Sequence, residues 1–356
     1  MEHQNKRIFE YDYCRVVATL LVVISHCTYY RIANSTYGAM DYSGLVANGC
    51  FMLSLAGFGK NFLYLFHMPL FFALSGALFF DGIKKQRYRS ARKFFSGKAR
   101  SLLIPFLLVT FCYSVPIKVI TGYYEGNFLR NIICGQLLLQ GNTHLWFLPT
   151  LFCIFLASWL LEYLSLPDVG KIFLLFILYF ISSYVTIALV GNVFQYLIWF
   201  YMGYYFERYR ERINKTITGK QVVFQIIVCS VLYLGYRVLS KQQEVTFLFL
   251  KGMVKFWLVV CLCYLTYQFC YLASMKRTAY NSTWYQLVLR NSMGIYLYSD
   301  PLNYAIMFLF AKTLGSFIFT NPFGVIVMVL TRFTVTLWMS TVLTEVLRKC
   351  HLKYLC

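Results

Sequence analysis

Charged side chains are scarce in this chain, and acidic ones are the scarcest. Of its 356 residues 13% are charged, with 13 Asp or Glu against 33 Lys or Arg. A soluble domain carries about twice that charged fraction, so the composition excludes an ordinary water-soluble fold. The remaining chain is 59% apolar and 20% aromatic, which is typical of a protein that lies in a lipid bilayer.

Signatures of several other classes are also missing. The twelve cysteines include no CxxC pair and no metal-ligand spacing, so no metal is expected. Cys50 and Cys134 fall in loops that are candidates for a disulfide. The first apolar run leads into His26 and not into a small-residue cleavage site, so no cleavable signal peptide is expected. No repeat, linker or low-complexity segment divides the chain, and residues 1–356 are expected to form a single integral membrane domain.

Apolar runs of about 20 residues, which are long enough to cross the bilayer core, recur along the whole sequence. They predict an all-α fold, a polytopic membrane helix bundle with about ten transmembrane helices. The stretch 45–58 is a candidate re-entrant or interfacial piece. The expected spans are 11–30, 62–80, 102–121, 145–164, 171–190, 192–206, 221–239, 252–272, 292–311 and 322–347.

The net charge of +20 is concentrated in a few loops. The segment 82–101 holds eight Lys or Arg and no acid, and the loops near 208–220 and 276–290 are basic too. Because cytoplasmic loops carry an excess of Lys and Arg, these loops and both termini are expected in the cytoplasm of a multi-pass cell-membrane protein. No nucleic-acid-binding pattern accompanies the basic residues, so their expected partner is the lipid bilayer, not nucleic acid.

The first apolar run carries ionisable side chains on one face. Each helical residue advances about 100°, so Asp12, Arg15, Thr19, Val22 and His26 fall within an arc of about 80°. Charge that faces lipid costs several kcal/mol, so this stripe is expected to face the bundle interior or a wet cavity. Arg15 and His26 lie about 16 Å apart along the helix axis. Two purely structural interpretations stay open: an interfacial ion pair of Asp12 with Arg15, and a buried structural role for His26.

Five short motifs follow one another along the chain. They are RIFEYDYCRVVATLLVVISH from Arg7, FHMPLFFALSGALFF from Phe66, KARSLLIPF from Lys98, HLWFLPTLF from His144 and NSMGIYLYSDPL from Asn291. Their order and spacing resemble the acyltransferase-3 family of integral membrane acyltransferases. The opening signature of that family, an arginine followed by ten residues and a histidine, is matched by Arg15 and His26.

The resemblance implies an O-acetyltransferase-like enzyme of polysaccharide modification, a transferase for groups other than aminoacyl groups. It would move an acyl group, acetyl first of all, from cytoplasmic acetyl-CoA or another acyl-CoA to a hydroxyl of a glycan, a lipid-linked sugar or another cell-envelope acceptor. Histidine can serve as base or nucleophile at neutral pH, so His26 is the main catalytic candidate. Arg15 and Asp12 complete the catalytic set.

Two further groups of residues are candidates for binding. Arg15, Lys98 and Arg100 are expected near the cytoplasm, where they could bind the phosphates of acyl-CoA. His67, His144 and Trp146 are expected to contact the acceptor sugar. An interfacial aromatic belt is the alternative for Trp146, and a structural role is the alternative for His67.

The ninth predicted span departs from the family pattern. The family usually has a histidine three residues after the tyrosine of this motif, whereas here Ser299 follows Tyr296 and is followed by Asp300. Ser299 is therefore not counted as catalytic. Asp300 and Arg332 should both lie near the midplane of the membrane, so they are expected to form a structural ion pair.

A secondary transporter or exporter is the rival interpretation. Intramembrane Asp, Arg and His residues suit proton relays. Against it, the sequence contains no internal repeat and no paired broken helices of the kind that transporters use.

Overall fold

The computed structural model of the protein describes residues 7–34, 36–42, 45, 51–88, 90–164, 166–242, 244–352 and 355. Nearly all of this chain is helical, which confirms the all-α prediction. The described strands are β1 (Arg31–Asn34) and β2 (Gly38–Asp41), which pair as one antiparallel hairpin with Arg31 opposite Asp41. The candidate partner Cys50 lies outside the described residues, and so does a disulfide that would contain it.

The helices follow one another with short connections. In chain order they are α1 (Phe9–His26), α2 (Phe51–Lys84), α3 (Ala91–Lys98), η2 (Ala99–Leu103), α4 (Ile104–Val109), η3 (Thr110–Ser114), α5 (Val115–Ile120), α6 (Phe128–Arg130), η4 (Asn131–Leu137), η5 (His144–Trp146), α7 (Phe147–Tyr163), α8 (Asp168–Ile181), η6 (Ser182–Tyr184), α9 (Ala188–Thr216), α10 (Gly219–Leu239), α11 (Val245–Lys276), η7 (Ala279–Asn281), α12 (Thr283–Leu314), α13 (Phe317–Thr320) and α14 (Pro322–Lys349).

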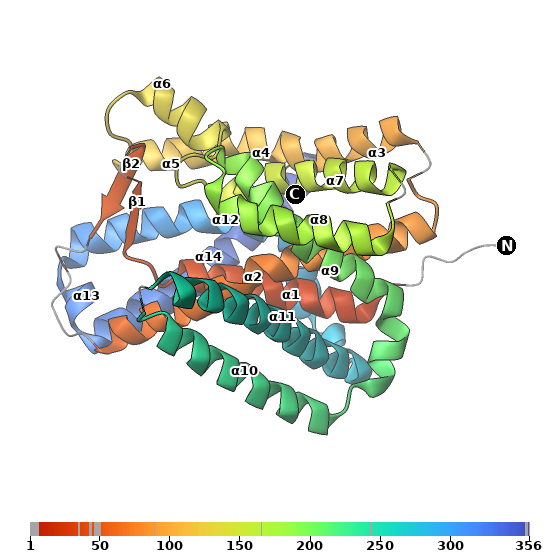
Figure 1. The fold of residues 1–356 in the computed structure, drawn as a ribbon. Coiled ribbons are helices and arrows are strands. Elements are labelled where there is room, and N and C mark those ends of the chain that lie inside the picture. The colour runs from red at the N-terminus through yellow and green to blue at the C-terminus, as the bar shows by residue number, and fades with distance from the viewer. Residues whose placement is uncertain are drawn as a thin grey trace.

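The long helices run roughly side by side along one direction of the molecule (Figure 1). The β1–β2 hairpin and α13 lie at one end, called here the hairpin end. The described N-terminal residues and the connection from α2 to α3 lie at the opposite end, called the basic end. Helix α1 packs against α2, α11, α12 and α14, so its polar stripe faces other helices. Within that stripe Asp12, Thr19 and Val22 are all buried, as the periodicity predicts.

Helices α2 and α9 approach each other closely because glycines stand at their contact. A Cβ atom added at Gly76 would lie 1.8 Å from the backbone oxygen of Phe200, and one added at Gly203 would lie 1.7 Å from that of Ala73. A Cβ atom at Gly294 would lie 2.0 Å from Oγ1 of Thr344. Gly76, Gly203 and Gly294 therefore allow close packing between helices.

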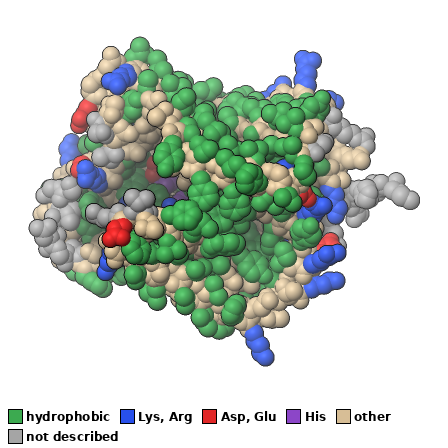
Figure 2. Space-filling model, viewed as in Figure 1, with side chains coloured by type: hydrophobic (Ala, Val, Ile, Leu, Met, Phe, Trp, Pro, Cys, Tyr) green, Lys and Arg blue, Asp and Glu red, His purple; other side chains and the backbone are tan. Residues whose placement is uncertain are grey.

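Among the described helices, six are long and apolar enough to cross a membrane. They are Phe51–Lys84, Ala91–Ile120, His144–Tyr163, Gly219–Leu239, Thr246–Lys276 and Pro322–Lys349. Each matches one predicted span, but the count of ten is not confirmed. The other four predicted spans coincide with α1, α8, α9 and α12, which are shorter or more polar. In Figure 2 apolar side chains cover the middle of the visible face, and Lys and Arg gather toward its ends.

Two predicted boundaries are wrong. The stretch 45–58 does not form a separate piece, because its described part from Phe51 onward belongs to the 34-residue helix α2. The predicted span 192–206 is the middle of α9, a helix of 29 residues. In both cases the helix continues past the end of the apolar run, since backbone hydrogen bonding does not stop where the hydrophobic pattern does.

Candidate active site

A cavity of about 850 Å³ opens toward the hairpin end. Its lining comes from the C-terminal end of α1, from β1, α2, α9, α10 and α12, and from the segment that leads into α7. This hairpin-side cavity contains three of the side chains that the sequence assigned to catalysis or acceptor binding: His26, His67 and His144. Trp146, the fourth, lines it too. The structure therefore brings the predicted histidines together from α1, α2 and η5.

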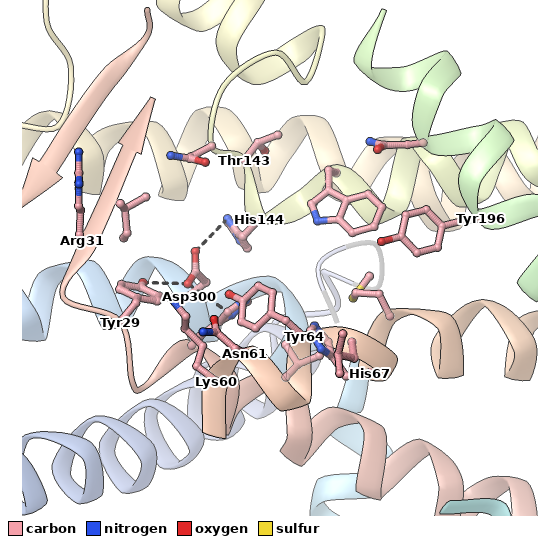
Figure 3. A pocket seen from close by; sticks show the side chains of 18 of the residues that line it. Tyr29, Arg31, Lys60, Asn61, Tyr64, His67, Thr143, His144, Tyr196 and Asp300 are labelled. Carbon is pink, nitrogen blue, oxygen red and sulfur yellow. Dashed lines mark hydrogen bonds and ion pairs between the residues drawn. The ribbon is translucent and has the colours of Figure 1, made fainter. Parts of the chain in front are cut away.

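Asp300 of α12 contacts two of these histidines, and Figure 3 shows its contacts with His144 and Tyr29. Its Oδ1 atom lies 3.4 Å from Nδ1 of His26, and its Oδ2 atom lies 3.9 Å from Nδ1 of His144. The hydroxyl of Tyr29 donates to Oδ1 at 2.9 Å. Asp300 is 4% exposed, so this carboxylate is buried against imidazoles and a phenol, at one wall of the cavity.

Backbone carbonyls select the tautomers of the other two histidines. Nε2 of His144 lies 3.0 Å from the oxygen of Leu297, and Nδ1 of His67 lies 2.7 Å from the oxygen of Leu63. A carbonyl only accepts, so each of these nitrogens is a donor. Neutral His144 then has no proton on the nitrogen that faces Asp300. His26 differs, because no backbone carbonyl bonds to its Nδ1 and the nearest acceptor is Oδ1 of Asp300 at 3.4 Å. With the proton on Nδ1, its Nε2 is the nitrogen that accepts a proton.

Arg332 does not form the predicted ion pair with Asp300. Its Nη2 donates to the oxygen of His26 at 2.8 Å, its Nη1 to the oxygen of Tyr29 at 2.6 Å, and its Nε to Oδ1 of Asn303 at 3.1 Å. The last carbonyls of a helix lack partners within it, and α1 ends at His26. The fully buried guanidinium satisfies the last carbonyl of α1 and the carbonyl of Tyr29 beyond it. Its Nη1, Nη2 and Nε therefore all bond to groups other than Asp300.

Asp300, and not Ser299, faces the cavity. Ser299 is fully buried and does not line it, and its backbone oxygen accepts from Asn303. The position at which the family usually carries a histidine thus points away from the site, and the next residue supplies the polar group. The sequence offers a signal for Asp300, since an ionisable residue inside a membrane span is a functional candidate by default. The predicted partner, Arg332, is wrong.

Aromatic rings build much of the remaining wall. The ring centroids of His26 and Tyr64 lie 6.1 Å apart, and those of Tyr64 and His67 lie 5.1 Å apart. On the opposite side Trp146 contacts Tyr196 at 5.1 Å. Aromatic faces of this kind stack on the apolar faces of sugar rings, while their polar atoms remain available for hydrogen bonds. The predicted acceptor-side residue Trp146 is therefore a cavity residue and not only part of an interfacial belt.

A second cavity, of about 230 Å³, lies on the other side of Tyr296 and Met68, which line both. Arg15 lines this basic-side cavity together with Ser75, Ser292 and mostly apolar side chains. The hydroxyl of Tyr296 donates to the backbone oxygen of His144 at 2.7 Å. The stripe on α1 therefore places Arg15 in one cavity and His26 in the other.

Three predicted site residues lie elsewhere. Asp12 pairs with Arg7, whose Nε is 2.5 Å from Oδ2, and it lies about 21 Å along α1 from His26. Lys98 stands over the ring of Phe155 at 3.8 Å, and Arg100 is exposed. None of the three lines either cavity. Within the described part of the chain, no three His, Cys, Asp or Glu side chains come close enough together to hold a metal ion.

Comparison with known proteins gives one match. The model of the acyltransferase-3 family, described as an acyltransferase domain, matches residues 8–344. No curated protein and no solved structure matches the chain. The matched range includes α1, α12 and most of α14, and with them His26, Asp300 and Arg332.

Proposed function

The chain belongs to the acyltransferase-3 family of membrane acyltransferases, and on that premise we propose that it transfers an acyl group, acetyl first of all, from cytoplasmic acyl-CoA to a hydroxyl of a cell-envelope glycan. The observation that carries the proposal is the position of His26. Its Nδ1 lies 3.4 Å from Asp300 in the wall of the hairpin-side cavity. That cavity meets the Arg15 cavity at Tyr296 and Met68.

His26 acts as the general base in this proposal. Its Nε2 takes the proton of the acceptor hydroxyl as the hydroxyl oxygen bonds to the thioester carbonyl carbon. The carbon–sulfur bond then breaks, and the coenzyme leaves as a thiol after His26 returns the proton. Asp300 orients the imidazole and stabilises the imidazolium that forms between the two steps, because a buried carboxylate beside Nδ1 favours that charge.

Arg15 guides the donor. Acyl-CoA carries several phosphate charges, which remain in water at the cytoplasmic surface and favour bonds to a guanidinium. The pantetheine arm is thin enough for a cavity of about 230 Å³, whereas the nucleotide is not. The distance of about 16 Å along α1 from Arg15 to His26 suits such an arm.

The proposal requires the basic end to face the cytoplasm and the hairpin end to face outward. Loop charge supports this orientation, in which both termini of this multi-pass protein would lie in the cytoplasm. A cysteine introduced at Thr36, in the turn of the hairpin, should react with an impermeant maleimide added to intact cells. A cysteine introduced at Ser90 should react only after the cells are opened. The parent protein gives the background from native cysteines, and the reverse pattern would invert the topology.

A pair of substitutions tests the transfer itself. His26→Ala should lower the transfer rate by about 10³-fold, since a general base contributes about 10²–10⁴, and should leave the Kd for acyl-CoA within about twofold. Arg15→Ala should weaken acyl-CoA binding by about tenfold. Arg15→Lys should restore part of that loss, because a point charge does not replace the planar fork.

The controls are His351→Ala and Arg92→Ala, which remove the same side chains at exposed positions. Binding is measured by calorimetry and transfer by mass spectrometry, both on detergent-purified protein. If His26→Ala transfers at the rate of the parent protein, His26 is not the base and the proposal fails.

A further inference from the structure

We propose that the acceptor carries a negative charge, which Lys60 of α2 and Arg237 of α10 bind at the hairpin-side cavity. The inference rests on the proposed function, because it concerns the second substrate of the same site. It specifies an anionic glycan, with a carboxylate or a phosphate beside the hydroxyl that accepts the acyl group. The carboxylate of a uronic acid and the phosphate of a lipid-linked sugar both supply this chemistry.

The charge distribution of the cavity is uneven. Among its described lining residues three are cations, Arg31, Lys60 and Arg237, and Asp300 alone is an acid. Asp300 already contacts His26, His144 and Tyr29. The rest of the wall therefore has an excess of positive charge. Such an excess around a concave, partly desolvated site attracts anions and raises their local concentration.

Arg31 is already neutralised. Its Nε lies 2.9 Å from Oδ2 of Asp41 across the β1–β2 hairpin. Lys60 and Arg237 differ, because the side chain of neither forms an ion pair or a hydrogen bond with any residue that the structure describes. Lys60 is half-buried at the cavity wall. A half-buried ammonium without a counter-ion has lost part of its hydration without a compensating ionic interaction. An anionic ligand would supply that interaction.

Helix periodicity places Lys60 on the face of α2 that lines the cavity. Lys60, Tyr64 and His67 stand at positions i, i+4 and i+7 of α2, so they share one face of that helix. All three line the cavity (Figure 3). The ring of Tyr64 contacts that of His26, and Lys60 lies one turn, about 6 Å, further toward the hairpin end. An anion held by Lys60 is then about one monosaccharide away from the proton acceptor.

Arg237 completes the site from another helix. Its guanidinium stands over the ring of Phe58 at 5.6 Å, and the same ring packs on Tyr233. Stacking on an aromatic face holds the guanidinium plane while its edge remains free to donate two parallel bonds to a carboxylate or a phosphate. Phe58 and Lys60 are two residues apart in α2 and lie on different faces of that helix, so the link between the two cations is the cavity that both line.

Binding of small probes tests this site without any transfer step. The probes are methyl β-D-glucoside, methyl β-D-glucuronide and the 6-phosphate of the glucoside, which differ only at C6. Their Kd values are measured by calorimetry on purified full-length protein in the absence of acyl-CoA. We expect both anionic probes to bind about tenfold more tightly than the glucoside, since a charge-assisted contact contributes about that factor.

The variants are Lys60→Gln, Arg237→Gln and the double variant, each of which should reduce the preference for the anionic probes. Lys241→Gln is the matched control, because it removes an exposed lysine at the end of α10 that does not line the cavity. It should keep the preference. The stronger of the two anionic probes identifies the source, a uronic acid or a phosphorylated carrier.

Two results overturn the inference. One is equal affinity of the parent protein for all three probes. The other is a preference that persists in the double variant, which would place the anion elsewhere. The proposed transfer fails separately: protein that binds the anionic probes but consumes no acyl-CoA with any acceptor would keep the anion site and lose the acyltransfer chemistry.

Discussion

The two cavities that meet at Tyr296 differ in size and in chemistry. The hairpin-side cavity measures about 850 Å³ and contains three histidines, Asp300, three cations and several phenols. The basic-side cavity measures about 230 Å³, and Arg15 is the charged residue among its described lining. The same helices, α1, α2 and α12, line both. The contrast comes from the side chains that these helices carry along their length, and from β1, α9, α10 and the segment before α7, which line only the larger cavity.

The two cavities therefore suit different tasks: the smaller one suits binding of the donor, and the larger one suits the reaction. A narrow, mostly apolar space with a single guanidinium suits a thin chain whose charge remains at the entrance. A wide polar space with imidazoles, a carboxylate and aromatic faces suits the chemistry and the second substrate. Substitutions can break this division or sharpen it.

Asp300→Asn should have the largest effect among substitutions outside His26. The amide keeps the size of the side chain and can still accept from Tyr29, but it loses the charge that stabilises the imidazolium of His26. We expect kcat to fall by about 10²–10³-fold with little change in the Kd for acyl-CoA, because the basic-side cavity is untouched. Asp168→Asn, which removes an exposed carboxylate paired with Arg208, is the control. Equal losses in the two variants would contradict a role for Asp300 beside His26.

Gly76→Ala should damage both cavities together. The new methyl group would lie 1.8 Å from the backbone oxygen of Phe200, so α2 and α9 must separate. Overpacking of this kind costs about 1–3 kcal/mol. The midpoint of thermal unfolding should fall, and both acyl-CoA binding and transfer should weaken. Gly235→Ala is the control in α10, where an added Cβ meets nothing within 4 Å. Unfolding midpoints that match would show that the close contact is not required.

Tyr296→Ala should join the two cavities. The pantetheine arm must pass Tyr296 and Met68 to reach His26, and removing the ring widens that passage, so more water surrounds the thioester. Hydrolysis of acyl-CoA without acceptor should rise roughly fivefold, because exclusion of water normally suppresses this side reaction. Tyr296→Phe keeps the ring, loses only the bond to His144, and should hydrolyse acyl-CoA at the parent rate. The readout is release of free thiol. No increase in Tyr296→Ala would mean that Tyr296 does not separate the cavities.

Lys98→Gln should have the smallest effect. The sequence makes Lys98 a candidate for binding acyl-CoA, yet its ammonium lies over the ring of Phe155 and outside the Arg15 cavity. We expect the Kd for acyl-CoA to change by less than about twofold, as for other screened charges, against about tenfold for Arg15→Gln. Calorimetry on the two variants side by side measures the difference. A loss as large as that of Arg15→Gln would return Lys98 to the donor site.

The sequence predicted which segments are helical better than it predicted the direction in which each helix points its polar side chains. Periodicity placed Asp12, Thr19 and Val22 on the buried face of α1, since a 100° step leaves little choice when the surroundings are apolar. Depth in the membrane likewise put Asp300 and Arg332 at one level. Depth does not say which way each side chain points, and Arg332 turned to the free carbonyls at the end of α1.

Other parts of the site could not be read from one sequence. Lys60 precedes the predicted span 62–80 and Arg237 lies near the end of the span 221–239, so the sequence suggests interfacial cations and marks neither as a cavity residue. Their proximity depends on how α2 and α10 pack, which no periodicity encodes. The ion pair of Asp12 was also unpredictable in its partner, because Arg7 precedes the first turn of α1 and Arg15 lies within the helix. The position of Tyr296 between the two cavities also depends on helix packing, so one sequence does not predict it.

The bonds from Arg332 to His26 and Tyr29 also set a time at which the site becomes complete. Arg332 follows His26 by 306 residues, and chains are synthesised at about 5–20 residues per second. For about 15 to 60 s after His26 leaves the ribosome, the carbonyls at the end of α1 have no guanidinium, and the loop that positions Tyr29 has no anchor. Helix α14 is the last of the described helices to be made. A nascent chain in the membrane therefore carries its histidine from the start but holds the imidazole against Asp300 only once the final helix has inserted.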